Sequence, residues 1–105
     1  MPILVLVAYK PKPGQEAALD TAVRDHVPIL RRLGLATNRE PIIAKAKDGT
    51  VVEMFEWVSQ EAIDSAHRNP AVHAMWGQFG ACCDYLPIGQ VPEASQLFSS
   101  FSPFE

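Results

Sequence analysis

The segment PILVLVAY, residues 2 to 9, restricts the fold of this chain more than any other feature. Its short apolar run predicts a β-strand in which both alternating sets of side chains are hydrophobic. Because successive side chains point to opposite faces of a sheet, both faces of this strand must be covered. The segment is too short to span a membrane as a helix and has no basic region before it, so we expect neither a membrane anchor nor a signal peptide.

A second strand of this kind, VVEMFEWV at residues 51 to 58, contains two glutamates. Glu53 and Glu56 are an odd number of residues apart, so they point to opposite faces of the sheet. Glu53 shares its face with Phe55 and Trp57, whereas Glu56 lies among aliphatic side chains. At least one of the two carboxylates is therefore expected to point into a buried region.

Local signals predict the elements between and around these strands. Residues 14 to 33 have helical hydrophobic spacing, with a kink or break expected near residues 24 to 28 because Pro28 removes a backbone hydrogen bond. Residues 40 to 47 predict a strand at a sheet edge, and Asp48-Gly49 predicts the hairpin turn that follows it.

The second half of the chain predicts two short helices and a last strand. Ser59 is the expected N-cap of one helix, and Asn69 followed by a proline is the expected start of the other. Residues 84 to 91 predict a strand that a proline confines to a sheet edge. The tail, about residues 91 to 105, is rich in phenylalanine, so we expect it to pack against the rest of the chain.

The resulting order, β-α-β-β-α-β, is the ferredoxin-like arrangement of the α+β class, and 105 residues suit a single domain. In this topology the first and third strands are central and the helices cover one face only. Nothing in the chain is left to cover the second apolar face. We therefore expect a homodimer in which two sheets pack face to face, as in a dimeric α/β barrel.

Composition and charge exclude several other classes of protein. The chain is 48% hydrophobic and 20% charged, with a net charge of −3 and scattered basic residues, so we expect no nucleic-acid partner and no membrane partner. The cysteines, Cys82 and Cys83, are adjacent, which disfavours a disulfide and favours a cytoplasmic location. Because metal-ligand spacings and nucleotide-binding motifs are absent from the sequence, we expect no metal and no cofactor.

The run WVSQEAIDSAH, residues 57 to 67, resembles the W-x-S-x-E-A stretch and following His of dimeric α/β-barrel proteins of the antibiotic biosynthesis monooxygenase (ABM) type. The sequence KPG after the first strand is similar to their first turn, and the resemblance covers residues 2 to 85. It implies a cleft between the sheet and the helices. The family includes cofactor-independent oxygenases of aromatic polyketides or quinols, haem-degrading proteins, and members without an assigned activity.

Two departures from the family pattern bear on function. Many relatives carry an acidic residue two positions before the Trp, where this chain has Phe55, with Glu56 directly before Trp57 and Glu53 four positions before it. The haem-degrading relatives share an Asn on the first strand, and PILVLVAY contains none. Haem chemistry is therefore disfavoured.

Glu53 and His67 are the candidate catalytic residues. A carboxylate on the aromatic face is a candidate base for a phenol or hydroquinone, and His67 lies nearest to the motif histidine of the family. The structural alternatives are an ion pair with Arg or Lys for either glutamate, and an interaction with the end of the helix dipole for His67.

The candidate ligand contacts are mostly aromatic, because flat rings offer a large contact area to a flat ligand. They are Tyr9, His26, Phe55, Trp57 and Trp76. Tyr9 and His26 would orient ligand oxygens, and the two tryptophans would form opposite walls of a slot. The alternative for each is ordinary core packing.

The leading hypothesis is a protein that binds a small aromatic or quinone-like molecule. If the protein is an enzyme, cofactor-independent monooxygenation is the favoured reaction: a base deprotonates the substrate, and the electron-rich product reacts with oxygen. Two alternatives stay open. One is a non-catalytic dimer that binds a metabolite or a protein, with the Phe-rich tail as its working surface, and the other is an isomerase or lactone-processing enzyme on the same fold.

Overall fold

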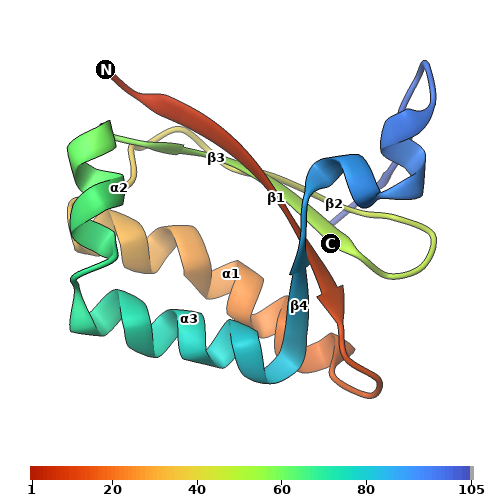
Figure 1. Cartoon of the computed structure of the whole chain (residues 1–105), viewed down its shortest axis with the longest axis horizontal. Coiled ribbons are helices and arrows are strands. Elements are labelled where there is room, and N and C mark those ends of the chain that lie inside the picture. Colours follow the sequence, from red (N-terminus) through yellow and green to blue (C-terminus); the bar gives the residue numbers. More distant parts are fainter. Residues whose placement is uncertain (105) are drawn as a thin grey trace.

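The computed structural model describes residues 1–104 as an antiparallel sheet with the α-helices on one side of it (Figure 1). The strands lie in the order β4-β1-β3-β2-β5, so β1 and β3 are central, as predicted. The α+β, ferredoxin-like fold is confirmed. The elements in chain order are β1 (Ile3–Pro11), α1 (Glu16–Arg32), β2 (Ile42–Lys45), β3 (Val51–Trp57), α2 (Gln60–Ala66), α3 (Pro70–Cys82), β4 (Cys83–Leu86), the 3₁₀ turns η1 (Ile88–Gln90) and η2 (Pro92–Ser95), and β5 (Ser102–Pro103).

The register between β1 and β3 decides which side chains face the helices. Val7 lies opposite Glu53, and Tyr9 lies opposite Val51. Odd-numbered residues of both strands therefore point toward the helices, where Tyr9, Val51 and Phe55 join the main hydrophobic core. Even-numbered residues point to the outer face, so Glu53 and Glu56 lie on opposite sides of the sheet, as their spacing predicts.

Helix α1 is continuous from Glu16 to Arg32, so of the kink or break expected near residues 24 to 28 the break does not occur. The same side of the helix buries apolar residues before and after the proline, including Val23, Val27 and Leu30. This packing outweighs the hydrogen bond that Pro28 cannot donate. The helix ends, as predicted, at a glycine in the left-handed conformation, Gly34, with a φ of 76°.

The predicted caps and turn are confirmed. The hydroxyl of Ser59 accepts a hydrogen bond from the backbone N–H of Ala62 at the start of α2. The side chain of Asn69 accepts a hydrogen bond from the backbone N–H of Ala71 at the start of α3. In the hairpin between β2 and β3, the carboxylate of Asp48 accepts the N–H of Thr50.

The outer strands are shorter than predicted. Strand β2 is Ile42–Lys45 rather than residues 40 to 47, and β4 is Cys83–Leu86 rather than residues 84 to 91. Strand β4 pairs with β1 and forms an edge of the sheet, as predicted. It ends directly before a proline, which cannot donate a ladder hydrogen bond.

The residues after β4 fold back over one end of the outer face. Val91 packs there against Ala8 and Val52, and the carboxylate of Glu93 accepts the backbone N–H of Lys47. Strand β5 then pairs with β2, so β2 is not the edge of the sheet that its sequence suggested. Phe101 and Phe104 pack against the two core clusters, as expected of the tail, whereas Leu97 and Phe98 are 92% and 81% exposed.

The rest of the outer face is apolar and open in this chain. Leu4, Leu6 and Ile42 are 51%, 48% and 65% exposed. Leu6 lies opposite Met54, which lies opposite Ile42, so the three side chains form a row across β1, β3 and β2. Within residues 1–104, no helix is long and apolar enough to cross a membrane.

Candidate functional site

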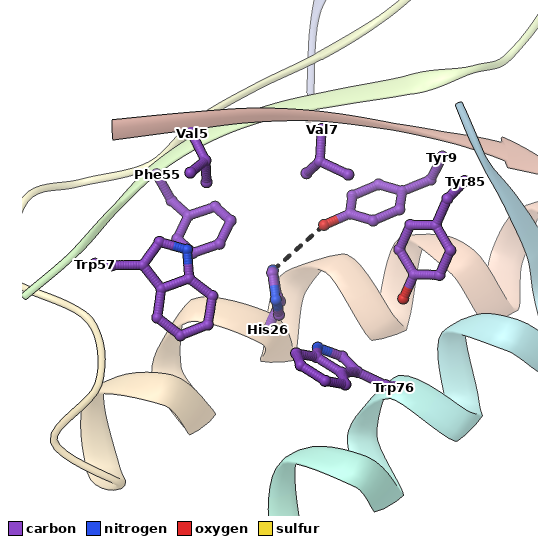
Figure 2. Close-up of a pocket in the computed structure, with 8 residues that line it drawn as sticks. All are labelled: Val5, Val7, Tyr9, His26, Phe55, Trp57, Trp76 and Tyr85. Carbon is purple, nitrogen blue, oxygen red and sulfur yellow. Dashed lines mark hydrogen bonds between the residues drawn. The ribbon is translucent and has the colours of Figure 1, made fainter. Parts of the chain in front are cut away.

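A cavity of about 330 Å³ lies between the sheet and the helices α1 and α3 (Figure 2). Its volume is roughly twice that of a protein cavity of about 150 Å³ that holds benzene, so it suits a ring system larger than one ring. None of the described residues that line it is Lys, Arg, Asp or Glu. The lining residues are Val5, Val7, Tyr9, His26, Phe55, Trp57, Trp76 and Tyr85.

Strand parity and pairing explain how these residues meet. Val5, Val7 and Tyr9 are alternate residues of β1, and Phe55 and Trp57 are their counterparts on β3. Helix α1 contributes a histidine, helix α3 contributes a tryptophan, and β4 contributes a tyrosine. All five residues predicted to contact a ligand therefore lie at one cavity, and ligand binding itself stays a prediction.

Glu53 is fully buried behind this lining. Its Oε1 accepts a hydrogen bond from the Tyr9 hydroxyl at 2.7 Å and lies 2.8 Å from Nδ1 of His26. Its Oε2 is also buried and has no hydrogen-bond partner among the described residues. The buried acid is therefore paired with a histidine and a tyrosine rather than with the Arg or Lys that we considered.

The hydrogen bond to Glu53 decides which nitrogen of His26 carries the proton. A carboxylate oxygen can only accept, so Nδ1 is the donor, and when the ring is neutral the lone pair is on Nε2. Nε2 makes no hydrogen bond within residues 1–104, and the ring lines the cavity. Edge contacts with Phe55 and Phe79, at centroid distances of 4.9 and 5.2 Å, fix the ring. His26 therefore has one ring nitrogen against a buried carboxylate while its ring lines the cavity.

The ring of Tyr9 lines the cavity, while its hydroxyl donates a hydrogen bond to Glu53. Burial, together with the carboxylate of Glu53, raises the pKa of Tyr9 far above its ordinary value, so the phenol stays protonated and donates. The ring stacks on Phe79 with a centroid distance of 4.8 Å. The sequence suggested that this hydroxyl would bind a ligand oxygen. In the structure it donates to Glu53 instead.

The two tryptophans lie on different sides of the cavity (Figure 2). Trp57 comes from β3 and packs beside Phe55 at a centroid distance of 5.5 Å. Trp76 comes from α3. Together they provide large flat surfaces from the sheet and from the helical layer.

His67 lies outside the cavity lining. It is exposed, its Nδ1 is 2.9 Å from the backbone oxygen of Ile63, and its ring meets Trp76 edge-on at 5.2 Å. The structure therefore does not bring His67 and Glu53 together. The contact of His67 with the cavity runs through Trp76.

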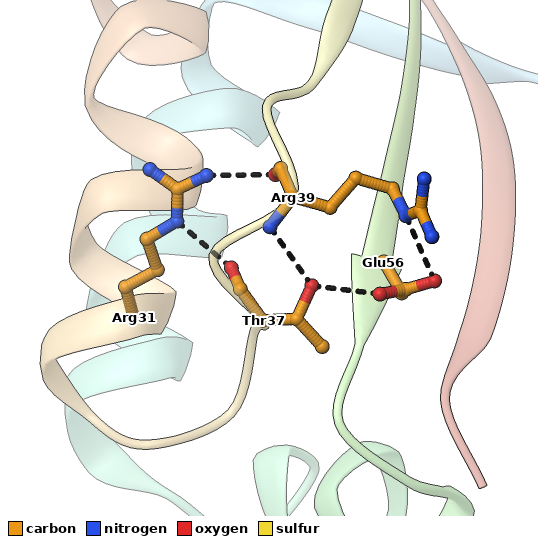
Figure 3. Close-up of polar contacts among 4 residues, drawn as sticks. All are labelled: Arg31, Thr37, Arg39 and Glu56. Atoms are coloured by element: carbon orange, nitrogen blue, oxygen red, sulfur yellow. Dashed lines mark hydrogen bonds and ion pairs between the residues drawn. The ribbon is translucent and has the colours of Figure 1, made fainter.

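Glu56, on the outer face, takes part in a structural network (Figure 3). Its two carboxylate oxygens accept hydrogen bonds from the Thr37 hydroxyl at 2.8 Å and from Nε of Arg39 at 3.0 Å. Arg31 of α1 donates to the backbone oxygens of Thr37 and Arg39. Glu56 thus ties the loop between α1 and β2 to the sheet.

Sequence reasoning did not identify Val5, Val7 and Tyr85 as site residues. The valines share strand parity with Tyr9, which was a usable signal. Tyr85 faces the cavity because it pairs with Tyr9 across β1 and β4, and that register is not readable from a short strand. Within the described part of the chain, no group of three or more His, Cys, Asp or Glu side chains is placed to hold a metal ion.

No family model and no curated protein matches this chain. Solved structures do match it. Rv0793 from Mycobacterium tuberculosis is 19% identical with a TM-score of 0.62, over 83% of this chain and 94% of that chain. SnoaB, a cofactor-independent oxygenase from Streptomyces nogalater, is 11% identical with a TM-score of 0.67, over 81% of this chain and 86% of that chain.

A third match, SO0527 from Shewanella oneidensis, is 18% identical with a TM-score of 0.63, over 81% of this chain and 84% of that chain. At such identities the likeness is one of fold. It agrees with the resemblance carried by residues 57 to 67. The chain therefore has the fold of the ABM-like dimeric α/β-barrel proteins.

Proposed function

We propose that this protein binds a small aromatic, quinone-like molecule in the cavity and oxygenates it without a cofactor. The observation that carries the proposal is the 2.8 Å contact between Glu53 and Nδ1 of His26 directly behind an aromatic lining. It leaves Nε2 of His26 as the proton acceptor on the cavity side. The fold is shared with SnoaB, which is described as a cofactor-independent oxygenase.

In the proposed reaction, Nε2 of His26 takes a proton from the substrate. The carboxylate of Glu53 stabilises the resulting imidazolium through the Nδ1–H bond, and Tyr9 holds that carboxylate in place. The aromatic side chains hold the ring system of the substrate. The base is therefore His26, because Glu53 lies behind the lining and His67 lies outside it.

Oxygen then completes the reaction. The deprotonated substrate passes its electron pair to O₂, a carbon–oxygen bond forms, and the peroxide takes back the proton from His26. Loss of water from the hydroperoxide leaves a carbonyl group, so one oxygen atom enters the product and the other leaves as water. Two C–H bonds of the reacting carbon are thereby replaced by one C=O group. The lining around the reacting carbon is mostly apolar, which favours binding of an apolar ring system.

Oxygen consumption with a panel of anthrones, naphthols and hydroquinones tests the proposal. His26→Gln keeps a donor for Glu53 but cannot take up the proton, so turnover should fall at least about 100-fold. Glu53→Gln should lower turnover less, and Glu56→Gln, on the opposite face of the same strand, should not change it. Unchanged turnover in His26→Gln, or no turnover of any compound by the wild type, would sink the proposal.

A proton-transferring isomerase is the second candidate, because the Glu53–His26 pair moves protons without any need for oxygen. Under anaerobic conditions in deuterated water, an isomerase would exchange substrate hydrogens and turn over. The proposed oxygenase would show exchange without product. The two functions are thus separable on one sample.

We also propose that two copies of the chain pair through the outer sheet face. The support is the row formed by Leu6, Met54 and Ile42, which is apolar and open in the single chain, together with a fold known from dimeric barrels. A cytoplasmic location fits the buried free thiols of Cys82 and Cys83.

A further inference from the structure

We infer that Tyr85 holds an oxygen atom of the bound molecule, so that the ligand is a ring compound with a hydroxyl or carbonyl group at the end that faces β4. The inference rests on the proposed ligand cavity. It does not depend on His26 acting as a base.

The backbone and two aromatic neighbours fix the position of Tyr85. It lies opposite Tyr9 in the pairing of β4 with β1. Its ring meets that of Tyr9 at a centroid distance of 5.6 Å and an angle of 63°, and it lies 6.3 Å from the ring of Phe79. A hydroxyl on a ring held in this way has a defined direction at the cavity wall (Figure 2).

Some hydrogen-bonding groups of the cavity lining already have a partner within the protein, and others do not. The hydroxyl of Tyr9 and Nδ1 of His26 are both engaged with Glu53. The hydroxyl of Tyr85 has no partner within residues 1–104. The indole N–H groups of the tryptophans can only donate, whereas a phenol both donates and accepts. Tyr85 can therefore form a hydrogen bond with a substrate hydroxyl and can also donate one to the carbonyl that oxygenation produces.

The environment of Tyr85 suits a donor at the entrance of the cavity. Burial raises the pKa of Tyr85 to about 12, so its hydroxyl stays protonated near neutral pH. At 51% exposure it is the most exposed of the aromatic lining residues that the structure describes. An oxygenated end of a ligand would lie here, with its apolar rings deeper among the other side chains.

Tryptophan fluorescence provides the assay, because the only two tryptophans of the chain, Trp57 and Trp76, both line the cavity. We would titrate wild type and Tyr85→Phe with tetralin and with its two phenols, 5,6,7,8-tetrahydro-1-naphthol and the 2-isomer, exciting at a wavelength that tyrosine does not absorb. Each phenol differs from tetralin by one oxygen atom. Tyr85→Phe keeps the ring and removes only the hydroxyl.

Loss of one hydrogen bond should weaken binding of at least one phenol by about threefold to tenfold, while the affinity for tetralin stays unchanged. Equal weakening of tetralin and the phenols would assign Tyr85 to packing and overturn the inference. Unchanged phenol binding in Tyr85→Phe would also overturn it and leave the proposed function intact. If the wild type binds none of the compounds, the proposed cavity ligand fails, and this inference fails with it.

Discussion

Replacement of Glu53 by methionine should leave the free energy of unfolding within about 1 kcal/mol of wild type, although Glu53 is fully buried. The reason lies in the two groups that bond to it. The Tyr9 hydroxyl and Nδ1 of His26 are 3.5 Å apart. Once the carboxylate is gone, the imidazole proton can move to Nε2, and Nδ1 can accept from Tyr9. The unbranched methionine side chain can fill the space of the glutamate.

The hydrogen bonds that the Glu53→Met substitution removes and the desolvation cost that it relieves are of similar size. The substitution removes two hydrogen bonds to a charged group, each worth about 1.5–3 kcal/mol. It also removes the burial of a charge, whose desolvation costs several kcal/mol, and Oε2 of Glu53 has no partner to offset that cost among the described residues. His26→Leu should behave differently. It leaves the carboxylate buried with Tyr9 as its remaining donor, and such a loss costs about 3–5 kcal/mol.

Urea unfolding at pH 7 measures both effects, at one fixed protein concentration because dimerisation would shift the midpoint. Glu56→Met is the matched control on the same strand. It breaks the bonds to Thr37 and Arg39, and a loss of about 1–2 kcal/mol is expected. If Glu53→Met destabilises the protein as much as His26→Leu, the carboxylate is a structural requirement, and our reasoning about its energetic balance is refuted.

Three further predictions concern the dimer, a helix cap and the hairpin. Leu6→Lys should turn a dimer into a monomer in sedimentation experiments, because it places a charge in the apolar row, and a monomeric wild type at micromolar concentration would contradict this. Ser59→Ala should lower the free energy of unfolding by about 1 kcal/mol in thermal melts, and an unchanged melting temperature would show that the cap contributes nothing. The Thr50 N–H lowers the pKa of Asp48, so this bond stabilises the fold above about pH 4 and is lost as the pH falls through the lowered value. The stability deficit of Asp48→Ala should therefore disappear in acid, and a constant deficit would argue against the bond.

The fold was predictable where local chemistry decides the structure. Alternation along residues 51 to 58 places Glu53 and Glu56 on opposite faces whatever else the chain does, because it is a property of extended backbone. The interruption expected near Pro28 failed because the penalty of proline is local, while the burial that offsets it comes from packing against the sheet. Strand β5 has only two residues, and its pairing with β2 defines it rather than any pattern of its own.

Five of the eight residues that line the cavity were predicted from the sequence, but their hydrogen-bond partners were not. His26 lies on the apolar face of α1, so its burial could be predicted from the sequence. Its pairing with Glu53 depends on how α1 is rotated about its axis against the sheet, which spacing within one element does not give. His67 was selected from a motif that marks the junction of a strand and a helix. The end of α2 places it beside Trp76 and outside the cavity.

The packing of the sheet does not explain why a glutamate is present at position 53. Neighbouring positions on the same face of β3, Val51 and Phe55, are filled by apolar side chains that pack in the core, and position 53 lies between them. An acid there leaves one buried oxygen without a partner within residues 1–104, which opposes folding. What the carboxylate does supply is an acceptor that fixes the proton of His26 on Nδ1 and leaves Nε2 for the cavity. A buried acid that adds little net stability and fixes the proton of His26 is better explained by the proposed chemistry of the cavity than by the stability of the sheet.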